Sequence, residues 1–157
     1  MSTPPPLLGL AEVVLNVADL PAMRRFYREV MGFPVLSEAC HTTGIEPDPE
    51  GEPTICFLTM FAADSPLGRA GHPQLLVLID AARHVFARER FRETTASSST
   101  LNHLAWEIAA ETFEEHRAFL EEHGLSPREI EFPAMGARAL FFEDPEGNEL
   151  ELICPKS

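Results

Sequence analysis

The first part of the chain alternates apolar and polar residues and then changes to a helical spacing. Residues 10–18 follow the two-residue period of a strand with one buried face. Asp19 stands where a helix N-cap is preferred, an apolar stripe recurs at helical spacing over 20–31, and Gly32 supplies a stop. These patterns predict a strand followed by an amphipathic helix. Short apolar segments between loops rich in Pro, Gly and Asp predict three more strands, at 34–37, 54–61 and 74–80.

The second half of the chain repeats this order. The predicted elements are a strand at 101–108, a helix at 111–123 and strands at 129–132, 138–142 and 149–154. The segment Ala11-Glu12-Val13-Val14 aligns with Asn102-His103-Leu104-Ala105 at an offset of 91 residues. Because neither half buries its apolar face alone, we expect an α+β fold. In it, two βαβββ modules form one curved mixed sheet around a cup-shaped site, with both helices on the convex side.

The repeat also predicts the boundaries of the modules. The first βαβββ module is expected at 8–80 and the second at 101–156. The connector between them, 81–100, has several arginines followed by a Thr/Ser run, which is typical of a solvated helix and a linker.

Charge and cysteine content narrow the partners and the compartment. The net charge of −13 would repel nucleic acid and the anionic face of a membrane. Three widely spaced cysteines fit neither a zinc site nor a disulfide framework, which favours a reducing cytoplasm. No segment approaches the length of a membrane span. We therefore expect a cytoplasmic protein that binds a small molecule.

Strand parity selects a histidine as the strongest candidate for chemistry. In the predicted strand 101–108, His103 lies on the polar face, whereas Leu104 and Trp106 lie on the opposite face. We expect Leu104 and Trp106 to be buried beneath a helix, as we do Leu150 and Leu152. His103 is then expected to point away from the helix-covered core.

Two glutamates are predicted to join this histidine. Glu151 lies on the polar face in the middle of the last strand, and the repeat gives Glu12 the position in the first module that His103 has in the second. Carboxylate and imidazole groups suit a hard or borderline divalent ion. Glu149, which lies near the preceding turn, is interpreted as a solvated residue rather than a ligand.

Several segments carry a family resemblance. They are Glu12-Val-Val-Leu-Asn-Val-Ala-Asp-Leu, Phe26-Tyr27, Gly32-Phe33, Leu101-Asn-His-Leu-Ala, and Phe141 to Leu152 with its Asp-Pro-Glu-Gly-Asn turn. Together they resemble the vicinal oxygen chelate superfamily of glyoxalases, bleomycin-resistance proteins and extradiol dioxygenases. The resemblance implies a divalent metal, Fe(II), Mn(II) or Zn(II), held by Glu12, His103 and Glu151. It also implies a homodimer.

Departures from the family pattern bear on the reaction. The first ligand position is typically His in the dioxygenase branch and is Glu12 here, so two carboxylates would neutralise a divalent ion and weaken its Lewis acidity. Glyoxalase-like isomerases need a further carboxylate where Val77 aligns, which disfavours that branch. Extradiol dioxygenases usually add an acid–base His and a Tyr, and residues 126–140 contain neither. Loop residue His41 is the candidate substitute.

These considerations lead to a ranked set of functions. The first is a metal-dependent enzyme acting on a small oxygenated substrate by dioxygenase-like, extradiol ring cleavage. A glyoxalase-like isomerase or lyase is an alternative. A second alternative is a non-catalytic binding protein that sequesters a small molecule, as bleomycin-resistance proteins do.

Overall fold

The structure is a computed structural model that describes residues 12–44, 46–62, 73–90, 103–132 and 136–156. The chain divides into two compact units, Met1–Thr94 and Thr95–Ser157. Among the described residues, no helix has both the length and the apolar character needed to cross a bilayer.

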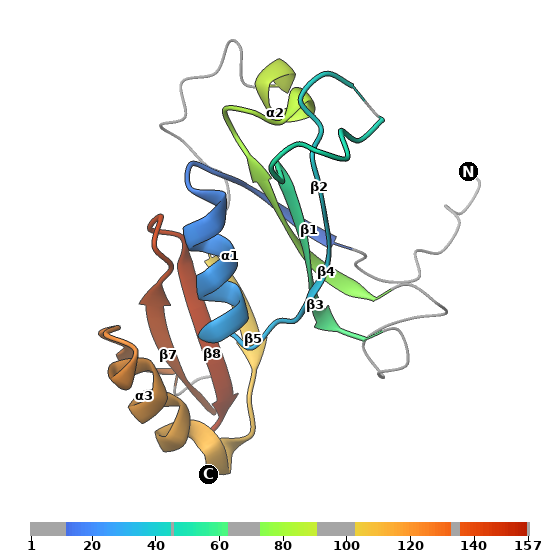
Figure 1. Cartoon of the computed structure of the whole chain (residues 1–157). Helices are drawn as coiled ribbons and strands as arrows, with labels where there is room; N and C mark the ends of the chain where they lie inside the picture. Colours follow the sequence, from blue (N-terminus) through green and yellow to red (C-terminus); the bar gives the residue numbers. More distant parts are fainter. Residues whose placement is uncertain (1–11, 45, 63–72, 91–102, 133–135, 157) are drawn as a thin grey trace, which may run out of the picture. The chain divides into compact units, whose positions relative to one another are not determined.

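The described residues of the first unit form two helices and a four-stranded mixed sheet (Figure 1). Its elements are β1 (Glu12–Val17), α1 (Leu20–Glu29), β2 (Val35–Ala39), β3 (Ile55–Phe61) and β4 (Gln74–Asp80), followed by the short helix α2 (Val85–Arg90). The strand order is β1-β4-β3-β2, with β1 parallel to β4 and the other pairs antiparallel. This is a βαβββ module.

Helix α1 begins at the predicted residue and ends at Glu29, two residues before the predicted end. The Asp19 carboxylate accepts a hydrogen bond from the Ala22 backbone N–H at 2.9 Å, which satisfies a donor in the first turn. Gly32 takes a positive φ of 72°, which a residue with a Cβ rarely adopts. The apolar side of α1, with Met23 and Tyr27 fully buried, packs on β3 and β4.

The second unit has the same order of elements. They are β5 (His103–Glu107), a 3-10 turn η1 (Ala110–Thr112), α3 (Phe113–Glu122), β6 (Arg128–Phe132), β7 (Ala137–Glu143) and β8 (Glu149–Pro155). The strand order β5-β8-β7-β6 repeats that of the first unit. The α+β class and the two βαβββ modules are thus confirmed. The described strands are hydrogen-bonded as two four-stranded sheets, one in each unit, rather than as the single sheet expected.

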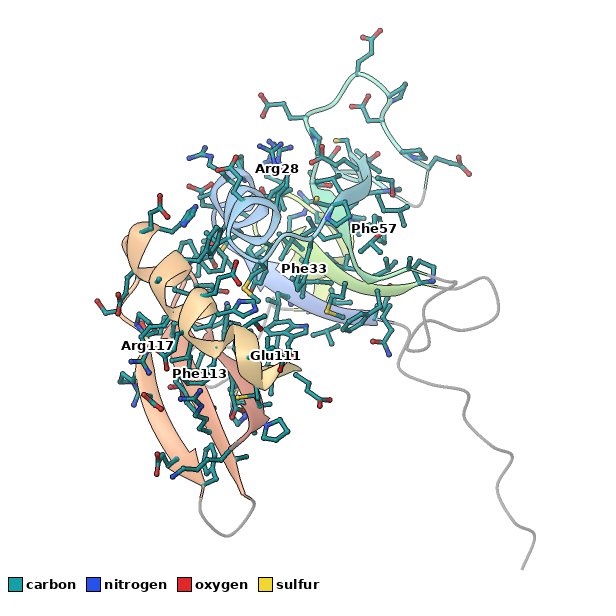
Figure 2. All side chains as sticks on the ribbon, turned by 90° about the horizontal axis from the view of Figure 1, so that it is seen from below. Arg28, Phe33, Phe57, Glu111, Phe113 and Arg117 are labelled. Carbon is teal, nitrogen blue, oxygen red and sulfur yellow. The ribbon has the colours of Figure 1, made fainter. Side chains whose placement is uncertain are left out.

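Helix α3 covers one face of the second sheet. Phe113 is fully buried, and the guanidinium carbon of Arg138, from β7, lies 3.8 Å from the centre of its ring. Arg117 of α3, labelled with Phe113 in Figure 2, forms an ion pair with Glu129 of β6. The strand pairing puts Leu150 and Leu152, both buried, on this same face. The helix-covered core of the unit therefore lies here.

The parity expected for β5 is observed, but the burial is less complete. His103 is exposed and lies on the face opposite α3, as expected. Leu104 and Trp106 are only half-buried, whereas full burial was expected. The reason is the position of β5 at the edge of the sheet, where a strand has one neighbour instead of two.

Candidate functional site

The open face of the second sheet brings His103 and Glu151 into contact. The two residues lie on the parallel neighbours β5 and β8, diagonally across the strand register. Nε2 of His103 lies 3.1 Å from Oε2 of Glu151. The side chain of Glu151 is 7% exposed and that of His103 is 35% exposed. The nearly buried carboxylate of Glu151 is thus paired with the more exposed imidazole of His103.

An aromatic side chain packs beside this pair. Phe141 of β7 is the register partner of Glu151 and is buried, and its ring meets the His103 ring edge-on with centroids 5.7 Å apart. Burial makes an unpaired carboxylate costly, so Glu151 needs a cationic or hydrogen-bonding partner at this position. The apolar surroundings therefore favour either the imidazole or a bound cation beside Glu151.

The chemistry and spacing of these two donor atoms suit a divalent ion. An imidazole nitrogen and a carboxylate oxygen are common ligands of Zn(II), Fe(II) and Mn(II). Two atoms that each lie about 2.1 Å from one ion are about 3.0 Å apart when they subtend a right angle at it. The observed 3.1 Å between Nε2 and Oε2 matches this spacing. His103 and Glu151 therefore fit two positions of a metal site.

A second charged pair lies on the same face and was not anticipated from the sequence. Arg128 of β6 forms an ion pair with Glu149 of β8, and its guanidinium carbon lies 5.9 Å from the centre of the Phe141 ring. Strand parity could have indicated this pair, because Arg128 and Ile130 lie on the open face of the sheet and Glu129 lies on the face covered by α3. Glu149 is half-buried and paired, instead of simply solvated as expected from its position near the turn.

The strand registers establish which residues of the two modules are equivalent. Glu12 pairs with Leu75 in the first sheet, and His103 pairs with Glu149 in the second. Two residues further along, Val77 corresponds to Glu151. The alignment made from the repeat is therefore confirmed, and the first module has a buried valine where the second has its carboxylate. Val77 packs with Ile55 and Leu75 in an apolar cluster.

Glu12 is exposed at the start of β1, in the first unit, whereas His103 and Glu151 belong to the second. In the part of the chain that the structure describes, no three His, Cys, Asp or Glu side chains gather closely enough to hold a metal ion. The structure thus brings together two of the three predicted ligands. The complete ligand set stays a prediction.

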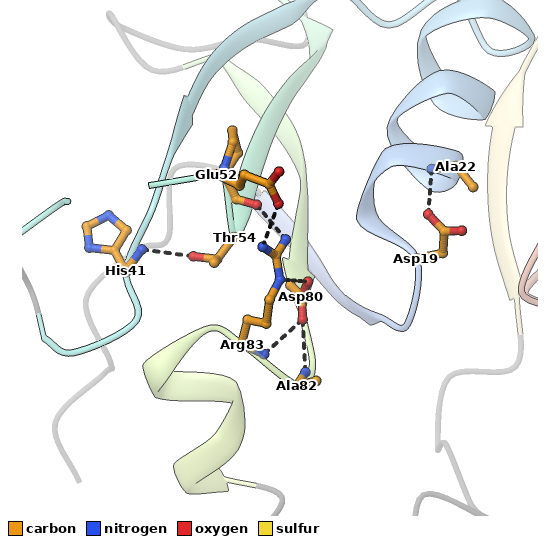
Figure 3. Close-up of polar contacts among 9 residues, drawn as sticks. Asp19, Ala22, His41, Glu52, Thr54, Asp80, Ala82 and Arg83 are labelled. Carbon is orange, nitrogen blue, oxygen red and sulfur yellow. Dashed lines mark hydrogen bonds and ion pairs between the residues drawn. The ribbon is translucent and has the colours of Figure 1, made fainter. Parts of the chain in front are cut away.

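His41 belongs to a polar network at one end of the first sheet (Figure 3). Its backbone N–H donates to Oγ1 of Thr54 at 2.8 Å, and its Nδ1 lies 3.3 Å from the Gly44 carbonyl oxygen. Its ring also lies 5.5 Å from that of His84, which is buried. Within this unit, Glu12 begins β1 at the opposite end of the sheet and on the opposite edge strand from β2, which precedes His41. The structure does not bring these two residues together.

Charges next to His41 stabilise this end of the sheet. The Asp80 carboxylate accepts hydrogen bonds from Nε of Arg83 at 2.7 Å and from the backbone N–H groups of Ala82 and Arg83. Burial alone would raise the pKa of Asp80, but the bonds to Arg83 outweigh it and lower that pKa. Burial, together with the nearby His41, lowers the pKa of His84. Nη2 of Arg83 also donates to the Pro53 carbonyl at 3.0 Å, which ties the turn after β4 to the loop before β3.

The chain thus consists of two βαβββ modules with matching strand registers, and the second carries an imidazole–carboxylate pair on its open sheet face. The sequence matches the Glyoxalase/Bleomycin resistance protein/Dioxygenase superfamily over residues 9–152, and the chain belongs to that superfamily. Most of its members are metal-dependent enzymes of the vicinal oxygen chelate type. A comparison with curated proteins gives no match.

Solved structures with the same fold come from several bacteria. A glyoxalase/dioxygenase from Nostoc punctiforme has a TM-score of 0.63 and 19% identity, covering 100% of this chain and 97% of that one. The fosfomycin resistance protein FosX from Listeria monocytogenes has a TM-score of 0.61 and 16% identity, covering 94% and 93%. Lactoylglutathione lyase from Agrobacterium tumefaciens has a TM-score of 0.60 and 19% identity, covering 97% of both chains. At these identities the likeness shows the fold alone.

Proposed function

We propose that this protein is a metal-dependent enzyme that binds a small substrate through two vicinal oxygens. The observation that carries the proposal is the 3.1 Å contact between Nε2 of His103 and Oε2 of the nearly buried Glu151. The proposed third ligand is Glu12, the register equivalent of His103 in the first module. Fe(II), Mn(II) and Zn(II) all accept this donor set.

The bound ion would polarise substrate oxygens and keep them adjacent. The number of protein ligands would determine how many metal positions stay open for substrate oxygens. A neutral imidazole and two carboxylates balance the charge of a divalent ion, and Val77 stands where the first module would otherwise supply a further carboxylate. Three protein ligands would leave room for two substrate oxygens and for dioxygen.

We propose dioxygenase-like extradiol ring cleavage as the reaction class. The proposed three-ligand site is consistent with it, because a catechol would take two metal positions and dioxygen a third. His41 is the acid–base candidate from the sequence. Its place at the end of the sheet opposite Glu12 favours a structural role, so we expect His41→Ala to lower stability more than turnover.

The test is anaerobic reconstitution with Fe(II) followed by oxygen uptake with a panel of catechols. The wild-type protein is expected to consume oxygen and produce the absorbance of a ring-cleaved product. His103→Ala and Glu12→Gln should lose this activity. The matched control is Glu131→Gln, because Glu131 is an exposed residue paired with Lys156. Oxygen uptake that persists in His103→Ala, or is absent from metal-loaded wild type, would contradict the reaction class.

A lyase or isomerase is the second candidate. Similar solved structures include a lactoylglutathione lyase, and a FosX variant from Listeria monocytogenes complexed with Mn(II) and 1S,2S-dihydroxypropylphosphonic acid. Such reactions consume no oxygen. Metal-loaded protein that converts a substrate anaerobically would favour this candidate, whereas tight binding without conversion would favour sequestration.

A further inference from the structure

Two carboxylates on β8 lie on the same sheet face as His103 and close to it along the strand register. Glu149 and Glu151 lie two residues apart and therefore on one face of the sheet. Glu149 is the direct register partner of His103, and Glu151 is the next residue along that face. Side chains of directly paired residues approach within reach of each other. Nevertheless, the contact with His103 is made by Glu151.

The position of Arg128 explains why Glu149 does not contact His103. Its guanidinium group reaches from β6 across Phe141 of β7 and forms an ion pair with Oε1 of Glu149. Among the described residues, Glu149 is its only charged partner. Phe141 fills the space between the two pairs, because its ring contacts both the His103 ring and the Arg128 guanidinium. Glu149 is thereby directed toward β6, away from His103.

The first module provides an internal comparison. Its registers make Ser37 the equivalent of Arg128 and Leu75 the equivalent of Glu149, because Ser37 pairs with Phe57 and Phe57 pairs with Val77. The arginine and the second glutamate are thus both absent from the module that lacks the carboxylate equivalent to Glu151. They are both present in the module that has it.

We propose that Arg128 is a positioning residue that holds Glu149 away from His103, so that Glu151 alone of the two joins the histidine. The inference rests on the proposed metal-binding function. If both glutamates joined His103 and Glu12, three carboxylates would exceed the charge of a divalent ion. The additional carboxylate, that of Glu149, would also occupy a metal position that the substrate needs. Arg128 therefore keeps a coordination position open.

The first test uses metal-free protein and the 15N resonances of the His103 ring, assigned with a His103→Gln variant. In the wild-type background, Glu151→Gln is expected to shift the Nε2 resonance, and Glu149→Gln is expected to leave it in place. In the Arg128→Gln background, Glu149→Gln should shift it as well, because the released Glu149 contacts the imidazole. If Glu149→Gln leaves the Nε2 resonance unchanged in the Arg128→Gln background, the proposal is overturned.

The second test measures Co(II) binding by calorimetry and visible absorption. Arg128→Gln should bind Co(II) about fivefold more tightly with an altered spectrum, because a freed carboxylate adds roughly 1 kcal/mol of attraction. Arg128→Lys and the double variant Arg128→Gln/Glu149→Gln should restore both properties. Arg117→Gln, which breaks an ion pair of α3 with β6, is the control. An Arg128→Gln protein that binds Co(II) like the wild type would contradict the proposal.

The two tests separate this inference from the proposed function. Wild-type protein that takes up no Co(II) would contradict the metal site, and the ring resonances would still decide whether Arg128 directs Glu149. The Arg128 side chain is 64% exposed, and an exposed ion pair contributes little to stability, so these variants are expected to fold.

Discussion

At the scale of single residues, four side chains on the open face of the second sheet form two pairs beside one aromatic ring. His103 pairs with Glu151 and Arg128 pairs with Glu149, while Phe141 contacts the cationic or imidazole member of each. The two pairs differ in burial, since the side chain of Glu151 is 7% exposed and that of Glu149 is 34% exposed. Loss of a partner therefore costs more at Glu151 than at Glu149.

Cys56 is the residue for which the structure predicts a clear pH effect. It is fully buried in β3, and burial, reinforced by nearby Glu38, raises the pKa of its thiol to about 12. The unfolded thiol ionises near 9.0, so above that pH the unfolded chain releases a proton that the folded chain retains. The free energy of unfolding should therefore fall as pH rises from 9.0 toward 12.

Urea denaturation across this pH range tests the prediction. Cys56→Ala should have lower stability than the wild type at neutral pH and a flatter dependence on pH above 9.0. Cys154→Ala, which removes another buried thiol, serves as the matched control. Equal slopes for wild type and Cys56→Ala would contradict the assignment. The native protein should also resist thiol alkylation until it is unfolded.

At the scale of elements, local signals give each module its order of strands and helices. Helix α1 depends on one of them, the Asp19 cap. Asp19→Ala should reduce the free energy of unfolding by about 1 kcal/mol, because the Ala22 N–H loses its acceptor. Asp19→Asn retains an acceptor oxygen and should recover most of that loss. Thermal and urea unfolding of the three proteins checks this, and an Asp19→Ala protein as stable as the wild type would contradict it.

The sequence predicted most elements because their signals are local. Alternation identified β1 and β5, and Gly32 and Gly124, both with positive φ, end the two main helices. The predicted helix 111–123 differs at its start, where Thr112 bonds to the Ala109 carbonyl and the chain forms a 3-10 turn before α3. Such tightening of a first turn depends on tertiary context, which the residue pattern does not contain.

The candidate site was predictable only where strand parity applied. His103 and Glu151 followed from alternation along β5 and β8, and the register confirmed the equivalence of Val77 and Glu151. Arg128 was missed because its partner lies two strands away, which requires knowledge of the strand order. His41 lies in a loop, and no periodicity shows which end of the sheet such a residue reaches.

At the scale of the whole molecule, metal binding should stabilise the folded chain. A ligand present at a hundred times its Kd adds about 2.7 kcal/mol, which corresponds to a rise in Tm of roughly 5–10 °C for a chain of this size. Thermal unfolding with Mn(II), Fe(II) and Zn(II) should show such a shift. The net charge of −13 also attracts divalent ions without specificity. His103→Gln measured under the same conditions corrects for this, and equal shifts in both proteins would contradict a defined site.

Metal stoichiometry tests the central claim most directly, that Glu12, His103 and Glu151 hold a divalent ion. The protein is purified without chelators, reconstituted anaerobically and measured by elemental analysis. We predict a single ion per wild-type chain, its loss in His103→Ala and Glu151→Gln, and its retention in Glu149→Gln, whose side chain is paired with Arg128. Unchanged stoichiometry in His103→Ala, or no ion in the wild type, would contradict the account.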